Sequence, residues 1–333
     1  MTIFEGLDVE WGPGTEITER KILSIGEWLG WRAQDVTASD AACLWGDGVH
    51  PYRTAYSLWA EKSGLLPPAR ESPAMRRGRL LEPVAMNMIR EDRPGWSVFK
   101  NEYYYRHSGA RIGATPDTLV FDHSRPDPKG TVQIKTVGSF SFKRSWKDQD
   151  TGELIVPLHV AVQAAIEAYL SGASWAAVAV MIAGDGGLDL EIVDVPLGSM
   201  SGIVRKLRGL VEQFWRRVES GEAYPPDWSK DAATILSVFR DASQPGIVIA
   251  PDDKEFGALV AERDRLSPLI AAGEAARNAR KIVDAQIIQR LGNSASARFG
   301  EVTVTASTVK RKAYEVEEST YRAVKVRRPL DYA

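Results

Sequence analysis

Three polar side chains on a predicted hairpin have the types and spacing of a metal site. Asp117 opens the apolar segment DTLVFD (117–122), and Gln133 and Lys135 lie on the next one, TVQIKTV (131–137). Residues two apart on a strand face the same way, so Gln133 and Lys135 share a face. Mg²⁺ prefers oxygen ligands, which Asp117, Gln133 and the carbonyl of Ile134 offer. Lys135 beside them can orient a water or stabilise charge at a phosphorus atom.

Gln133 is the unusual member of this set, because such sites commonly have an acid there. An amide oxygen can still coordinate Mg²⁺, but it brings no charge. Metal affinity would then depend more on Asp117 and on Glu82, a carboxylate of the predicted helix 75–91. A site that had lost catalysis would more often lack Asp117 or Lys135, and both are present. We therefore predict a variant but working site, although a Pro-Asp turn followed by an ordinary edge strand explains the same residues.

A second group of residues suits a phosphate. Arg32 and Ser39 lie seven residues apart in WRAQDVTASD, where a short helix is predicted to begin. A guanidinium offers a bidentate fork, and a helix start offers backbone donors. The alternatives are a surface charge at Arg32 and a simple cap at Ser39. Gln163 lies on the predicted helix 157–171, either near these sites or as a polar residue of a core helix.

The elements that must position these residues follow from apolar periodicity. Pro83 inside the helix 75–91 predicts a kink or a late helix start. The order of helices, an antiparallel meander, a helix, two strands and a helix predicts an α/β fold with a central mixed sheet flanked by helices. The expected helices are within 15–45 and at 54–65, 75–91, 157–171 and 200–221, and the expected strands at 96–106, 117–122, 131–137, 176–184 and 188–196.

Length and composition suggest two parts. The 333 residues allow one domain at 1–230, a linker at 231–251 and a helical extension with a small β-pair at 252–333. Ser267-Pro268 is expected to divide the long helix of the extension, and its β-pair is expected at 300–307 and 321–328.

Composition excludes several classes of protein. Lys and Arg number 42 against 44 Asp and Glu, so any nucleic-acid surface must be a local patch. The single Cys43 excludes an internal disulfide and a cysteine-based zinc site. The chain has neither a secretion-signal pattern at its start nor an apolar run approaching 18 residues. We therefore expect a cytoplasmic protein without a membrane partner.

Four further motifs, with the hairpin, resemble a known family. They are WLGWRAQDVTASDAACLWG (28–46), GRLLE (78–82), LHVAVQAAIEAYLSG (158–172) and FWRRVESGEAYPP (214–226). In this order they resemble the lambda-exonuclease-like branch of the PD-(D/E)xK nucleases, the YqaJ-type viral recombinases, over about residues 17–228. Gln133 departs from the family's acid, and Ala165 and Glu167 stand where further Gln or Tyr residues are common.

The resemblance implies a restriction-endonuclease-like core and a metal-dependent DNA exonuclease, with Mg²⁺ as cofactor and Mn²⁺ as a substitute. Asp117, Gln133, Ile134 and Glu82 would bind the metal, and Lys135 would complete the catalytic set. Arg32 and Ser39 would bind a DNA 5′-phosphate, and Gln163 would have a supporting role in the site.

By the same resemblance, the enzyme would act 5′ to 3′ on duplex ends and leave 3′ single strands for phage-type homologous recombination. Its partners would be DNA ends, a single-strand annealing protein and copies of itself in a homotrimer. Its compartment would be the bacterial host cytoplasm if a phage or prophage encodes it.

Two other functions remain open at this point. One is a structure- or site-specific DNA endonuclease with the same core. The other is a catalytically silent DNA-binding or assembly protein in which Gln133 marks the loss of activity.

Overall fold

The computed structural model describes residues 17–46, 48–66, 71–184, 186–239, 253–291, 296–299 and 302–305. The chain divides into two compact units, Met1–Val238 and Phe239–Ala333, which we describe separately. In the part of the chain that the structure describes, no helix combines the length and apolar character needed to cross a membrane.

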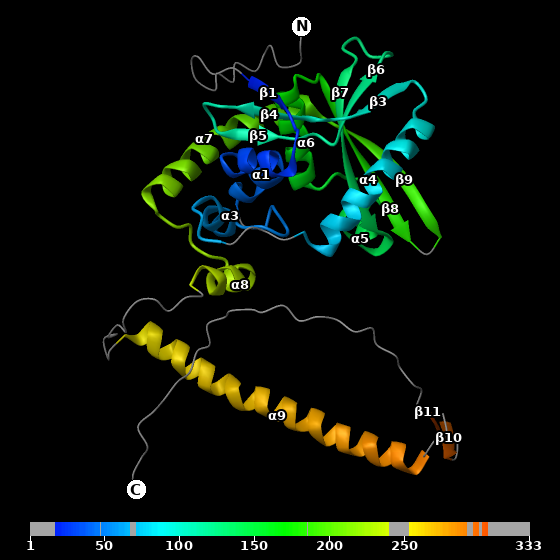
Figure 1. The fold of residues 1–333 in the computed structure, drawn as a ribbon, viewed down its shortest axis with the longest axis vertical. Coiled ribbons are helices and arrows are strands. Elements are labelled where there is room, and N and C mark those ends of the chain that lie inside the picture. Colours follow the sequence, from blue (N-terminus) through cyan, green and yellow to red (C-terminus); the bar gives the residue numbers. More distant parts are fainter. Residues whose placement is uncertain are drawn as a thin grey trace. The chain divides into compact units, whose positions relative to one another are not determined.

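A five-stranded mixed sheet forms the centre of the first unit (Figure 1). Its strand order is β3-β6-β7-β8-β9, and all neighbours are antiparallel except the pair β7 and β8. A parallel pair needs a crossover connection, which here contains α5 and α6. The strands are β3 (Trp96–Lys100), β6 (Thr118–Asp122), β7 (Lys129–Gly138), β8 (Trp175–Gly184) and β9 (Gly187–Val195), and the helices are α5 (Ser139–Ser145) and α6 (Leu158–Ser171).

Helices cover both faces of this sheet. Val178 and Val180 of β8 belong to the core cluster that includes α6 and α7 (Leu197–Ser220). Met181 and Ala179 belong to a separate cluster with α4 (Pro73–Asp92). Burial on both faces explains why β8 is a continuous apolar run. The predicted α/β class, with a mixed sheet flanked by helices, is confirmed.

The register of β7 decides where its polar residues point. Gln133 pairs with Val178, and Lys135 pairs with Val180. Paired residues of neighbouring strands share a face of the sheet, so Gln133 and Lys135 face the side covered by α6. The side chain of Ile134 packs in the cluster on the α4 side.

A second sheet of four strands has the order β1-β4-β5-β2. Strand β2 runs parallel to β5 and leads directly into α2, so this sheet positions Ser39. The strands are β1 (Ile17–Lys21), β2 (Val36–Thr37), β4 (Tyr103–His107) and β5 (Ile112–Ala114), and the neighbouring helices are α1 (Ile25–Ala33), α2 (Ala38–Ala41), the 3-10 helix η1 (Ala42–Leu44) and α3 (Ala55–Lys62).

Helix α4 runs from Pro73 to Asp92 and contains Pro83. The late start that Pro83 suggested is therefore wrong. Ser72 caps the helix by accepting a bond from the backbone N–H of Met75 (3.2 Å), and Pro73 occupies the first turn, where its missing N–H costs nothing. Ser72 and Pro73 therefore place the beginning of the helix ahead of Pro83.

The first unit extends beyond residue 230, where we expected a linker to begin. Helix α8 spans Trp228–Val238, and Asp231 within it is buried. Its carboxylate accepts bonds from Oγ1 of Thr54 (2.6 Å) and the backbone N–H of Asp227 (2.8 Å). Residues 240–251 of the expected linker lie outside the described residues.

The described residues of the second unit form one long helix and a strand pair. Helix α9 (Lys254–Leu291) continues through Pro268, so the expected division at Ser267-Pro268 is wrong. A single proline removes one backbone bond, which does not suffice to end this helix. Strand β10 (Ser296–Phe299) pairs antiparallel with β11 (Val302–Thr305). The expected partner strand, 321–328, lies outside the described residues.

Candidate active site

Asp117 lies directly before β6, opposite the centre of β7. One carboxylate oxygen of Asp117 accepts a hydrogen bond from the backbone N–H of Ile134 (2.8 Å). The backbone carbonyl of Asp117 accepts one from the backbone N–H of Asn101 (3.2 Å). Burial raises the pKa of Asp117 to about 6, against the opposing charge of Lys135. A buried carboxyl group of this kind is ready to exchange its proton for a cation.

Gln133 is buried, with 4% of its surface exposed. Among the residues that the structure describes, none forms a hydrogen bond with its Oε1 atom. A buried amide oxygen without a partner costs free energy. A hard cation is a partner of the required kind, because such cations bind amide oxygens.

Lys135 is held by a chain of hydrogen bonds from α6. Its Nζ donates to Oε1 of Gln163 (2.9 Å), and Nε2 of Gln163 donates to Oε1 of Glu167 (2.8 Å). Gln163 and Glu167 are one helical turn apart, so they share the face of α6 that covers β7. Gln163 therefore fixes the position of the ammonium group.

Glu82 reaches this region from α4. It forms an ion pair with Lys100 of β3 (3.1 Å), and its charge contributes to the raised pKa of Asp117. Within the described residues, no three His, Cys, Asp or Glu side chains gather closely enough to form a metal site of their own. A cation here would need the neutral oxygens of Gln133 or the backbone as well.

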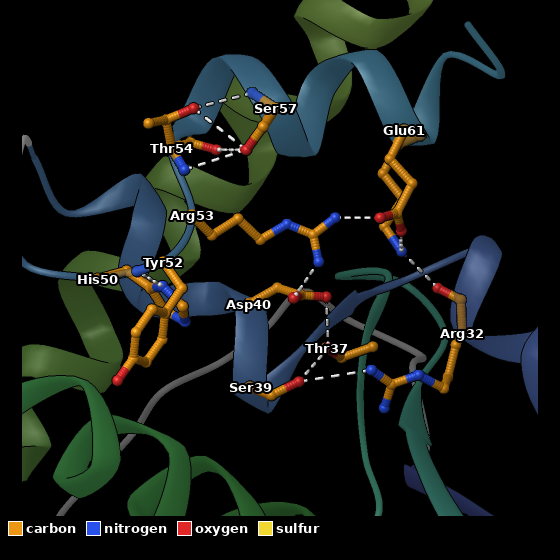
Figure 2. A network of polar contacts seen from close by, with 11 residues as sticks. Arg32, Thr37, Ser39, Asp40, His50, Tyr52, Arg53, Thr54, Ser57 and Glu61 are labelled. Atoms are coloured by element: carbon orange, nitrogen blue, oxygen red, sulfur yellow. Dashed lines mark hydrogen bonds and ion pairs between the residues drawn. The ribbon is translucent and has the colours of Figure 1, made fainter. Parts of the chain in front are cut away.

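Arg32 and Ser39, the expected phosphate ligands, are in contact. Nη2 of Arg32 donates to Oγ of Ser39 (3.5 Å), and that hydroxyl shares a hydrogen bond with Oγ1 of Thr37 (2.9 Å) (Figure 2). The guanidinium also lies 4.6 Å from the ring centroid of Trp28. An aromatic face holds an arginine without occupying its in-plane donors. Those donors can therefore donate hydrogen bonds to an anionic ligand.

A buried network supports this pair from behind. Asp40 accepts bonds from Oγ1 of Thr37 (2.6 Å) and Nη1 of Arg53 (2.5 Å), and Arg53 also pairs with Glu61 (Figure 2). Burial opposes ionisation of Asp40, but Arg53 and Arg32 outweigh it and hold its pKa below the usual range. The negative charge of Asp40 is thus neutralised mainly by Arg53, which leaves Arg32 available to a ligand.

Two histidines are electrostatic neighbours of Lys135. The rings of His50 and His159 meet edge to face, with centroids 5.5 Å apart. Burial lowers the pKa of His159 to about 4, with help from His50 and Lys135. Burial also lowers the pKa of His50, and the charge of Lys135 adds to that effect. The two groups of site residues are therefore electrostatic neighbours.

Sequence reasoning missed several of these residues. Arg53 and Glu61 carry no local signal, because their partners come from other elements. Glu167 was visible only as a departure from the family pattern. An acid on the otherwise apolar helix LHVAVQAAIEAYLS, four residues after Gln163, was the signal that could have identified it.

One known family matches part of the chain. The YqaJ-like viral recombinase domain matches residues 27–174, which include every site residue described above. This confirms the family resemblance of the sequence motifs, over a shorter range than the expected 17–228. No curated protein matches the chain.

Solved structures similar to this chain include an alkaline exonuclease from Laribacter hongkongensis, LHK-Exo, alone and in complex with dAMP. Each is 19% identical, has a TM-score of 0.43 and covers 63% of this chain and 99% of its own. An exonuclease candidate from Eubacterium rectale is 12% identical, with a TM-score of 0.38, and covers 68% of this chain and 96% of its own. TM-scores below 0.5 carry no inference about activity.

Proposed function

We propose that the protein is a divalent-metal-dependent DNA exonuclease. It would degrade one strand of linear duplex, 5′ to 3′, and leave 3′ single strands for homologous recombination. The observation that carries this proposal is the unpartnered, buried Oε1 of Gln133, on a strand whose next inward residue, Lys135, is held by Gln163. A folded protein tolerates such an oxygen where a ligand satisfies it.

The residues present fit a hard cation, because they supply oxygen atoms only. Asp117, the amide of Gln133, the carbonyl of Ile134 and, directly or through water, Glu82 would hold Mg²⁺, with Mn²⁺ as a substitute. When bound, the cation would polarise the phosphodiester and neutralise charge on its oxygens.

The protein's own groups would complete the reaction. Lys135, restrained by its bond to Gln163 (2.9 Å), would stabilise negative charge that develops on the phosphate. Arg32 and Ser39 would bind the terminal 5′-phosphate through the guanidinium fork and the hydroxyl. Binding the end of the strand would fix which bond meets the catalytic residues, and so would set the polarity of digestion.

Two partners belong to the same proposal. The 3′ single strand would pass to a single-strand annealing protein, and copies of the chain would assemble into a homotrimer around duplex DNA. Both rest on the family resemblance, and neither has a contact in the described residues.

Digestion of linear and closed-circular duplex in Mg²⁺, Mn²⁺ or EDTA tests the proposal. We expect metal-dependent release of nucleotides from the linear DNA only, and loss of this activity in Asp117→Ala. A control variant, Asp189→Ala on the exposed strand β9, should behave like the wild type. Cleavage of the circle would identify an endonuclease instead, and no cleavage of either DNA would identify a silent DNA-binding protein.

A further inference from the structure

Glu167 is a buried carboxylate that the proposed reaction has not yet used. It lies on α6 with 1% of its surface exposed. Its Oε1 accepts the bond from Nε2 of Gln163 (2.8 Å), whereas its Oε2 has no hydrogen-bond partner among the described residues. A carboxyl group so far from solvent is costly unless it is neutral, paired or bound to a metal. The position therefore calls for an additional partner.

The surroundings of Glu167 indicate which partner this is. Gln163 joins Glu167 to Lys135. Lys135 lies two residues after Gln133 on the same face of β7, so this chain of bonds brings Glu167 to the face that carries Gln133. Gln133 faces the side of the sheet that α6 covers, and its amide oxygen is also unpartnered. Two unsatisfied buried oxygens, one on β7 and one on α6, thus accompany Asp117.

We propose that Glu167 supplies the acidic metal ligand that Gln133 lacks. This inference rests on the proposed metal-dependent activity and deepens it. A carboxylate at residue 133 would give the site two negative charges together with Asp117, and Gln133 removes one. Glu167 restores it from the neighbouring helix, while the amide of Gln133 still offers its oxygen. Divalent cations bind more tightly as the number of charged ligands increases.

The structure also explains why Glu167 does not simply neutralise Lys135. Gln163 stands between them, accepting from the ammonium and donating to the carboxylate. This amide keeps the lysine and the acid apart, so that one remains free for the phosphate and the other for a cation. Gln163 is accordingly a positioning residue for both groups.

Mn²⁺ binding to the full chain without DNA tests the inference, measured by the electron paramagnetic resonance of free Mn²⁺. Glu167→Gln keeps the shape of the side chain and its ability to accept from Gln163. We expect it to weaken Mn²⁺ binding by about 10- to 100-fold. The double variant Glu167→Gln/Gln133→Glu returns the acid to β7, and its affinity should recover to near the wild-type value. A matched control is Glu219→Gln, which changes an exposed acid of α7.

Suppose that the wild type binds Mn²⁺ and digests DNA. If Glu167→Gln then binds Mn²⁺ as tightly as the wild type, the inference is overturned and the proposed function is left intact. A wild type that neither binds Mn²⁺ nor digests DNA would overturn both. Should Glu167→Gln fail to fold, Glu167→Asp takes its place. It keeps the charge but retracts it by one methylene, so weaker Mn²⁺ binding is expected and an unchanged affinity would contradict the role of Glu167.

Discussion

Gln133 shows most clearly how one residue changes the chemistry of this site. Its amide can bind a cation but cannot attract one by charge. The sequence identified this loss, because the residue lies two before Lys135 on a recognisable strand. It did not reveal that Glu167 is buried near Asp117, since that depends on how α6 packs on β7. The predicted metal residues and the added acid remain to be tested by metal binding.

The first residue-scale prediction concerns pH. The folded pKa of Asp117, about 6, lies above its ordinary value of 3.8. The folded state therefore holds a proton that the unfolded chain has released. The contribution of this proton to the stability of the fold is complete below about pH 4 and is lost as pH rises through 6. Without metal, the free energy of unfolding of the wild type should fall by roughly 1–3 kcal/mol between pH 4 and pH 7, relative to that of Asp117→Asn.

Chemical denaturation of both proteins at the two pH values measures this difference. Mn²⁺ added at pH 7 should stabilise the wild type much more than Asp117→Asn, because a cation replaces the proton. If the stability difference between the two proteins were the same at both pH values, Asp117 would not have the raised pKa on which this prediction depends.

The second residue-scale prediction concerns the phosphate pair. Arg32→Ala should reduce the rate of digestion of 5′-phosphorylated duplex by about 10-fold or more, because it removes a charge-assisted, bidentate contact. Digestion of 5′-hydroxyl duplex should hardly change. Arg20→Ala is the control, since Arg20 lies on the exposed strand β1. Equal losses on both substrates would indicate that Arg32 supports the fold rather than binding the end.

At the scale of elements, local patterns predicted much of the central sheet. Apolar alternation placed 117–122 and 131–137 as strands, and the structure has β6 at Thr118–Asp122 and β7 at Lys129–Gly138. The helix expected at 157–171 is α6 at Leu158–Ser171. Such elements carry their signal within their own residues.

Pairings between distant segments could not be predicted in this way. The parallel contact of β2 with β5 involves a strand of two residues, too short for any periodic signal. The bonds of Arg53 to Asp40 and of Thr54 to Asp231 likewise join different elements. The sequence therefore predicted Arg32 and Ser39 but not the buried network that supports them.

An element-scale prediction follows for Thr54, which caps α3 and links it to α8. Its hydroxyl accepts the backbone N–H of Ser57 (3.0 Å) and donates to buried Asp231 (2.6 Å). Thr54→Val keeps the shape but loses both bonds, and should cost about 1–3 kcal/mol of unfolding free energy. Thr54→Ser keeps both and serves as the control. Equal melting temperatures for Thr54→Val and Thr54→Ser would show that the bonds of Thr54 contribute nothing to stability.

For the whole molecule, charge sets a limit on how DNA can be bound. Lys and Arg nearly balance Asp and Glu, so the net charge is −2. Binding to DNA must then come from local groups rather than from the overall field. The described site residues all lie in the unit Met1–Val238.

The most direct test of the proposed function is the direction of digestion by the full chain. Linear duplex carrying a label at the 5′ or the 3′ end of one strand, with a 5′-phosphate or a 5′-hydroxyl, is digested in Mg²⁺. We expect the 5′ label to be released first, faster from phosphorylated ends, while the 3′ label of the same strand is released last. Release of the 3′ label first, or equal rates from both kinds of 5′ end, would contradict an exonuclease guided by Arg32 and Ser39.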